Sequence, residues 1–275
     1  QSRKYDHVFP SLAVSFPLGN VQMQLAYRAS IKRPSYWDLR GNITYANRYT
    51  YETGNPLLQP TTIQSLSLNT IYRWMSLSLS YNHYKNDYTS YVRAYSEENP
   101  TIGLLTREHI APYNRLSASL TLSPVIGKWS PRWGVQVQRY DCKVDTPRGV
   151  ETFDNPRAIL SWRNTVKFTD SFWINADAYY QTKSQIDNTE YLENSWYMNL
   201  NLYKGFMNDR MSLQLQVTDL FNTRKSHVLM YSGLRTMELD NEMHRTFSLT
   251  FRYKFNPTKS KYKGTGAGQS QKARM

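Results

Sequence analysis

Polar and apolar residues alternate along most of this chain, and almost no stretch has the spacing of a helix. The clearest case is segment 21–32, in which Val21, Met23 and Leu25 begin an apolar face while Gln22 begins a polar one. Successive side chains of a β-strand point to opposite faces, so this segment predicts a strand with one apolar and one hydrated surface.

The same alternation recurs along the chain and predicts eleven strands. Most approach the roughly 9–11 residues that a strand needs to cross a bilayer at a tilt. A soluble β-sandwich is the rival fold, because its strands alternate too, but those strands are usually only about 5–6 residues long. The predicted strands are 8–16, 21–32, 64–73, 76–84, 116–123, 133–137, 157–168, 172–182, 195–206, 211–218 and 246–255.

The connections between these strands fall into two length classes that alternate without exception. The short ones are 17–20, 74–75, 124–131, 169–171 and 207–210; the long ones are 33–62, 85–112, 139–156, 183–194 and 219–243. Outer-membrane barrels have short periplasmic turns and longer outer loops. The pattern therefore predicts an all-β chain folded as an antiparallel transmembrane β-barrel.

Strand direction predicts that the chain is only part of such a barrel. Single-chain bacterial barrels have an even number of strands, and the last strand is expected to run down into the periplasm. Counted back, the strand at 8–16 also runs downward, whereas a complete barrel would start upward. We therefore expect residues 1–255 to form the C-terminal half of a barrel of about 22 strands, a size whose lumen is plugged. Residues 256–275, rich in Lys, Gly and Ser, are expected to be a disordered basic periplasmic tail.

Composition agrees with a membrane wall. The chain has 22 Tyr, 10 Phe and 7 Trp, and barrels carry girdles of aromatic residues where strands end. The tryptophans near predicted strand ends are Trp74, Trp129, Trp133, Trp173 and Trp196. The net charge of +13 would suit a soluble nucleic-acid-binding β-protein, but that class needs clustered basic residues. The Lys and Arg residues are spread over many segments, so no nucleic-acid partner is expected.

Several segments resemble TonB-dependent receptors, and more closely the outer membrane protein beta-barrel family. Segments 33–39 (RPSYWDL) and 49–60 (YTYETGNPLLQP) look like an outer loop and strand entry, 219–222 (DLFN) looks like a motif near the end of such barrels, and 251–255 (FRYKF) resembles their aromatic-ended last strand. Thr61 departs from the pattern, because many receptors carry Glu there.

The resemblance implies a receptor that imports a nutrient such as a siderophore or a glycan across the bacterial outer membrane. Its partners would be outer-membrane lipid and lipopolysaccharide, TonB acting through an N-terminal plug that this chain lacks, and the barrel-assembly machinery. That machinery would read Phe251, Tyr253 and Phe255 as an assembly signal. The alternative is a passive porin or surface-binding barrel without energy coupling.

No enzymatic function is expected. His7, His83, His109, His227 and His244 are scattered, and no nucleophile, zinc or paired-histidine motif surrounds them. Cys142 is the only cysteine, which rules out an internal disulfide and a Cys-based zinc site; we interpret it as a loop thiol without a role. No metal or cofactor is predicted.

Two tyrosine-rich stretches are the candidate ligand site. Their members Tyr45, Tyr49, Tyr51, Tyr84, Tyr88 and Tyr91 would form a stacking surface for a sugar or an aromatic chelator under the outer loops. The alternative interpretation is girdle and loop packing. The predicted lumen-facing residues Arg28, Lys32, Arg163 and Lys167 would either attract an anionic ligand or solvate the lumen and pair with carboxylates.

Overall fold

A computed structural model of the protein describes residues 8–233 and 235–255. The predicted basic tail at 256–275 lies outside the described residues, as does His7. Among the described residues, no helix is both long enough and apolar enough to cross a membrane.

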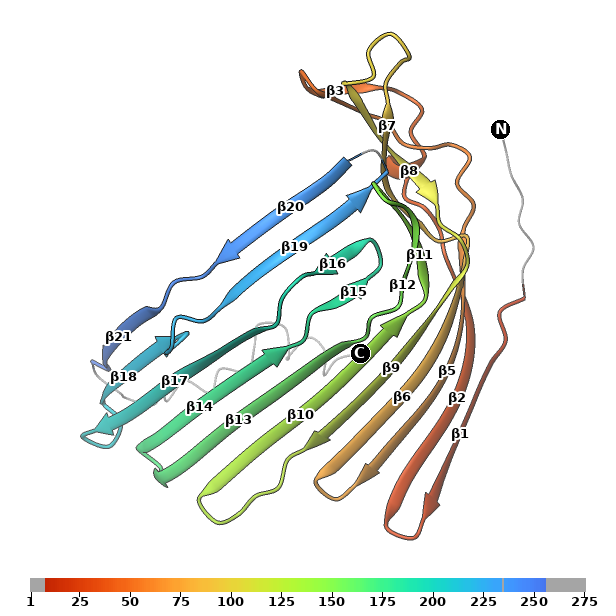
Figure 1. Ribbon diagram of the computed structural model, residues 1–275. Coiled ribbons are helices and arrows are strands. Elements are labelled where there is room, and N and C mark those ends of the chain that lie inside the picture. Colours follow the sequence, from red (N-terminus) through yellow and green to blue (C-terminus); the bar gives the residue numbers. More distant parts are fainter. Residues whose placement is uncertain (1–7, 234, 256–275) are drawn as a thin grey trace, which may run out of the picture.

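Eleven long strands form one curved antiparallel sheet, as the alternation predicts (Figure 1). Across the sheet the strands follow one another in the order below, and each is hydrogen-bonded to the strands before and after it. They are β1 (Ser11–Leu18), β2 (Val21–Lys32), β5 (Thr61–Tyr72), β6 (Met75–Lys85), β9 (Tyr113–Leu122), β10 (Trp129–Tyr140), β13 (Arg157–Thr169), β14 (Phe172–Gln181), β17 (Ser195–Phe206), β18 (Met211–Thr218) and β21 (Thr246–Tyr253). Within the described chain, β1 and β21 each pair on one side only, so the sheet has two edges and is not closed.

The register keeps apolar residues on one face of the sheet and polar residues on the other. Ser65 lies opposite both Arg28 and Asn82, whereas Leu68 lies opposite both Leu25 and Leu79. A slip of one residue in any pair would turn a whole apolar row to the wrong side. The apolar face stays uncovered: Leu25 is 45% exposed and Leu249 is 67% exposed.

All the long connections leave the sheet at one end and contain structure that the alternation did not predict. Ten short strands occur there, together with the single-turn helix α1 (Tyr36–Leu39). They are β3 (Thr44–Asn47), β4 (Thr50–Glu52), β7 (Tyr88–Ala94), β8 (Gly103–His109), β11 (Cys142–Thr146), β12 (Gly149–Phe153), β15 (Ser184–Ile186), β16 (Thr189–Tyr191), β19 (Lys225–Ser232) and β20 (Arg235–Glu242). They form five hairpins, one in each long connection, and two further pairings, β4 with β8 and β16 with β19, join different connections. Local patterning carries little signal for these strands, because they are short and part of their pairing is with distant segments.

The ends of most predicted strands shift by a few residues, the largest change being in β10, predicted as 133–137. Two differences bear on predicted aromatic roles. The last strand ends at Tyr253, so Phe255 lies beyond it, although its ring still contacts Tyr253 edge-on with the centroids 4.6 Å apart. Trp173, predicted as part of an aromatic girdle, pairs and stacks with Tyr203 on the polar face, because its position has the same parity as Asn175 and Asp177.

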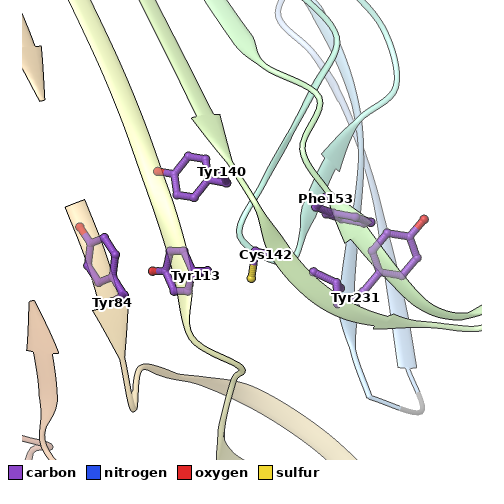
Figure 2. Packing of buried hydrophobic residues seen from close by; sticks show 7 residues of the cluster. Tyr84, Tyr113, Tyr140, Cys142, Phe153 and Tyr231 are labelled. Carbon is purple, nitrogen blue, oxygen red and sulfur yellow. The ribbon is translucent and has the colours of Figure 1, made fainter. Parts of the chain in front are cut away.

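A small core forms on the polar face at the long-loop end of the sheet (Figure 2). Tyr84 and Tyr113 stack with ring centroids 4.7 Å apart, and Phe153 of the β11–β12 hairpin contacts Tyr231 of β19 edge-on. The members of this loop core are Tyr84, Tyr113, Tyr140, Cys142, Val144, Phe153 and Tyr231. The loop core therefore fixes two outer loops, the β10–β13 and β18–β21 connections, against the sheet.

Candidate functional site

A cavity of about 460 Å³ adjoins the loop core, which contributes Tyr113, Cys142, Val144 and Tyr231 to its wall. The rest of the wall comes from residues 87–91, the end of β8, the turn between β15 and β16, and the tip of the β19–β20 hairpin. Its size falls in the range of about 300–1,000 Å³ that is usual for small-molecule sites. The cavity is the candidate functional site.

Contacts between loops close one side of this cavity. The Ser232 hydroxyl donates to the Ser90 carbonyl at 2.9 Å, and the Arg235 guanidinium donates to the Tyr49 carbonyl at 2.7 Å. Gly233 has a φ of +62°, and a Cβ there would meet the Tyr91 ring at 2.7 Å. Only glycine fits such a conformation and approach, so the tip of the hairpin is built to rest on β7.

Asp87 projects into the cavity from the end of β6. Its carboxylate accepts hydrogen bonds from the Tyr113 hydroxyl at 2.8 Å, the Tyr88 backbone N–H at 3.0 Å and the Thr61 hydroxyl at 3.3 Å. Thr61 is fully buried, so this carboxylate is tied to the sheet.

Asp187 reaches the cavity from the turn between β15 and β16, where its φ is +49°. The next residue fastens the turn to β19: the Asn188 amide donates to the Tyr231 carbonyl at 2.6 Å, and the Tyr231 N–H donates to the Asn188 carbonyl at 2.9 Å. The Asp187 carboxyl is open to the cavity yet has protein on most sides. Loss of hydration and the negative charge of Asp87 raise its pKa, while Arg115 opposes the rise.

Two tyrosine rings complete the wall. The Lys32 ammonium lies 5.6 Å from the Tyr88 ring centroid, and the Tyr88 hydroxyl donates to Asp38 of α1 at 3.2 Å. The pKa of Tyr91 is raised by burial and by the neighbouring Asp145 carboxylate. Carboxylates beside fixed aromatic faces can bind a ligand through charge, hydrogen bonds and stacking.

The structure separates the six predicted tyrosines into two groups. Tyr88 and Tyr91 line the cavity, and Tyr84 is buried in the loop core next to it. Tyr45 and Tyr51 lie in β3 and β4, and Tyr49 in the turn between these strands. The sheet runs in the order β3, β4, β8 and β7 and projects beyond the end of the barrel wall in Figure 1, so these three tyrosines lie toward the edge opposite to β7, which carries Tyr88 and Tyr91. There Tyr51 stacks on Tyr95 with centroids 4.6 Å apart, and Arg48 covers Tyr49.

The acidic residues of the cavity were missed by the sequence analysis. Asp87, Glu108, Asp145 and Asp187 come from four different loop elements. The Asp187-Asn188 pair is a recognisable turn signal, but nothing in the sequence indicates that this turn meets the other three carboxylates.

The predicted lumen-facing cations have different environments. Lys32 lines the cavity, whereas Arg163 donates to Asp177 across the sheet at 3.2 Å. Arg163 also lines a second hollow on the polar face, of about 380 Å³, together with Arg132, Tyr179 and Tyr197. Arg163 thus has a carboxylate partner within the wall itself.

Cys142, interpreted from the sequence as a loop thiol without a role, is part of the loop core. It is 2% exposed, and burial raises the pKa of its thiol to about 12. The neutral thiol is a poor nucleophile, so its role is packing.

One group of potential metal ligands occurs among the described residues. Donor atoms of His227, Glu238 and Asp240 on the β19–β20 hairpin lie within 4.8 Å of one another. The imidazole Nε2 is already 2.6 Å from the Glu238 carboxylate, and both acidic side chains are mostly exposed. This geometry fits a surface hydrogen bond.

Comparison with known proteins places this fold. Residues 1–253 match the family described as "Outer membrane protein beta-barrel family". No curated protein sequence matches the chain.

Several solved structures share the fold at low sequence identity. A mutant of the ferric enterobactin receptor PfeA from Pseudomonas aeruginosa, in complex with enterobactin, has a TM-score of 0.56 and 18% identity over 88% of this chain and 39% of its own. The siderophore receptor PirA from the same organism has a TM-score of 0.57 and 14% identity, covering 78% and 39%. The pyoverdine receptor FpvA from P. aeruginosa PAO1, bound to pyoverdine, has a TM-score of 0.56 and 15% identity, over 90% of this chain and 36% of its own. The chain therefore spans about two fifths of the length of these receptors.

Proposed function

Because the chain belongs to the outer membrane protein beta-barrel family and resides in the bacterial outer membrane, we propose that it forms part of the wall of an energy-coupled nutrient importer. The observation that carries the proposal is the cavity on the polar face, lined by four outer loops. A ligand held there would be positioned at the outer mouth of a lumen.

The two free edges of the sheet support a role as part of a larger wall. Unpaired backbone groups at β1 and β21 would be costly in hydrocarbon, where no water can satisfy them. Strands outside this chain would pair with both edges and close the barrel. In the proposed receptor a plug fills the lumen, faces the polar side chains of the sheet and connects the barrel to TonB.

The aromatic stripe on the last strand supports a role in assembly. Phe247, Leu249 and Phe251 of β21 are all more than 60% exposed on the apolar face. Together with Tyr253 and Phe255 they form a row that the barrel-assembly machinery would read as the strand arrives. The same row would then contact lipid in the inserted barrel.

Energised uptake tests the proposed importer. A strain lacking the gene, the same strain carrying it again, and a strain that carries it but lacks TonB would be grown in a complex medium, and depletion of each compound would be followed by mass spectrometry. An importer depletes at least one compound only when both the gene and TonB are present. Depletion that needs the gene but not TonB would instead indicate a passive porin.

Two tyrosine variants locate the ligand site. Tyr91→Ala removes a ring from the cavity wall and should slow the TonB-dependent depletion. Tyr36→Ala removes a ring that is 95% exposed on α1 and should leave it unchanged. If both variants import at the rate of the unmodified receptor, the cavity is not the entry site.

A further inference from the structure

We propose that the cavity accepts a positively charged organic group of the ligand, an ammonium or a guanidinium. The inference deepens the proposed function and rests on it, because it takes the cavity to be the place where the imported ligand binds. It assigns the ligand class as cationic rather than anionic or neutral.

The charges on the cavity wall favour a cation. Four carboxylates line it, from Asp87, Glu108, Asp145 and Asp187, against the ammonium groups of Lys32 and Lys143. Lys32 already lies against the Tyr88 ring. This acidic wall occurs in a chain whose net charge is +13, so it does not follow from the overall composition.

Asp187 is less well compensated by hydrogen bonds than Asp87. Asp87 has three hydrogen-bond donors around its carboxylate, whereas no hydrogen bond to the Asp187 carboxylate occurs within the described part of the chain. Its pKa is raised because hydration is lost and Asp87 is near, and the nearby Arg115 guanidinium opposes this rise without cancelling it. A cation placed between the two carboxylates would relieve both effects, which a neutral hydroxyl would do only weakly.

The aromatic rings add a second attraction of the same sign. Tyr88 and Tyr91 both line the cavity, and an aromatic face attracts a cation within about 6 Å of its centre. The Asp38 carboxylate fixes the Tyr88 ring through its hydroxyl, so no side-chain freedom is lost there when a ligand enters.

The spacing of the carboxylates excludes a preformed site for a bare metal ion. Within residues 8–233 and 235–255, a group of three His, Cys, Asp or Glu donors within 4.8 Å occurs only at His227, Glu238 and Asp240, outside the cavity. A larger organic cation fits donors that stand farther apart. An anionic chelate is disfavoured, because it would meet four carboxylates and two tyrosine rings.

Binding of three matched probes to the complete receptor, purified in detergent at physiological salt, tests the inference. The probes are trilysine, triglutamate and the neutral trisaccharide maltotriose, each titrated by calorimetry. Trilysine should bind, and bind at least about tenfold more tightly than either other probe.

Charge-neutralising variants then assign that binding to the cavity. Asp187→Asn keeps a residue type that tolerates positive φ and should weaken trilysine about tenfold or more. Asp145→Asn, on the exposed side of β11, serves as a second variant if the first folds poorly. Glu98→Gln removes one carboxylate from the β7–β8 connection outside the cavity wall and should change affinity less than about twofold.

Several outcomes would overturn the inference. The inference is wrong if trilysine does not bind, or if triglutamate or maltotriose binds more tightly than trilysine. It is also wrong if all three variants weaken trilysine binding equally. Failure here is distinguishable from failure of the importer: TonB-dependent depletion of an anionic or neutral compound would keep the importer and reject the cationic class. Trilysine binding that Asp187→Asn weakens, without any TonB-dependent depletion, would keep the site and reject the importer.

Discussion

Replacing Leu200 by Arg should destabilise the inserted barrel, because Leu200 lies near the middle of the apolar face. It stands opposite Ala176 and Val217 in the middle of β17, a strand of 12 residues. With a rise of about 3.3 Å per residue and a tilt of about 40°, the strand ends lie roughly 13 and 15 Å away along the membrane normal. The residue thus sits close to the middle of an apolar band about 25 Å tall.

An arginine at this depth costs about 2–4 kcal/mol, which corresponds to about a 30- to 700-fold change in the folding equilibrium. Asn201→Arg is the matched control, since Asn201 is the next residue and lies on the polar face. It loses one hydrogen bond, from the Gln214 amide at 3.1 Å, a loss of about 1 kcal/mol. The new guanidinium can remain hydrated in the lumen.

The assay is the folded fraction of the complete receptor in lipid vesicles across a urea series, measured as the band that migrates differently with and without heating. The Leu200→Arg midpoint should fall well below that of Asn201→Arg. Equal shifts, or a larger shift for Asn201→Arg, would show that the two faces of the sheet have been assigned the wrong way round.

Three further predictions concern the loops and the last strand. Phe153→Ala, at a site with no exposed surface, should destabilise the loop core by about 3–5 kcal/mol, seen as faster proteolysis of the β11–β12 hairpin while the membrane strands stay protected. Because the pKa of Asp187 is raised in the folded loops, its ionisation opposes their closure. Protection from hydrogen exchange in the turn between β15 and β16, taken relative to the intrinsic exchange rate at each pH, should be highest in mild acid and fall as pH passes through the raised pKa, and Asp187→Asn should remove that fall. Replacing Phe251 and Tyr253 together by Ser should lower the inserted fraction on the cell surface, whereas truncation after Phe255 should not; the opposite result would move the assembly signal into the tail.

Local patterning was sufficient for the membrane wall. The period-2 alternation identified all eleven strands of the large sheet and which residues share a face, for example Leu200 and Asn201 on opposite sides of β17. Each long strand presents one face to an apolar solvent and the other to polar groups, so the physical requirement repeats at every second residue. The errors are at strand ends: the alternation predicted a strand up to Phe255, whereas pairing stops at Tyr253, and alternation alone does not indicate where pairing stops.

The candidate site could be predicted only in part, because it is built from loops that contact one another. The aromatic composition drew attention to Tyr88 and Tyr91, which do line the cavity, but it gave equal weight to Tyr45 and Tyr51, which pack within the projecting sheet. Tyrosine is suited both to packing and to ligand stacking. The residue type alone therefore does not separate the two roles.

What the sequence by itself determined is the wall: strand number, alternation of faces, and short turns at one end with long loops at the other. What only the tertiary structure decided is which loop residues meet. Asp87 and Asp187 are brought into one cavity by the buried contacts of Phe153 with Tyr231 and of Asn188 with the Tyr231 backbone. A strand's facing depends on its immediate neighbours and the surrounding solvent, whereas the convergence of distant turns depends on packing between segments that no local periodicity encodes.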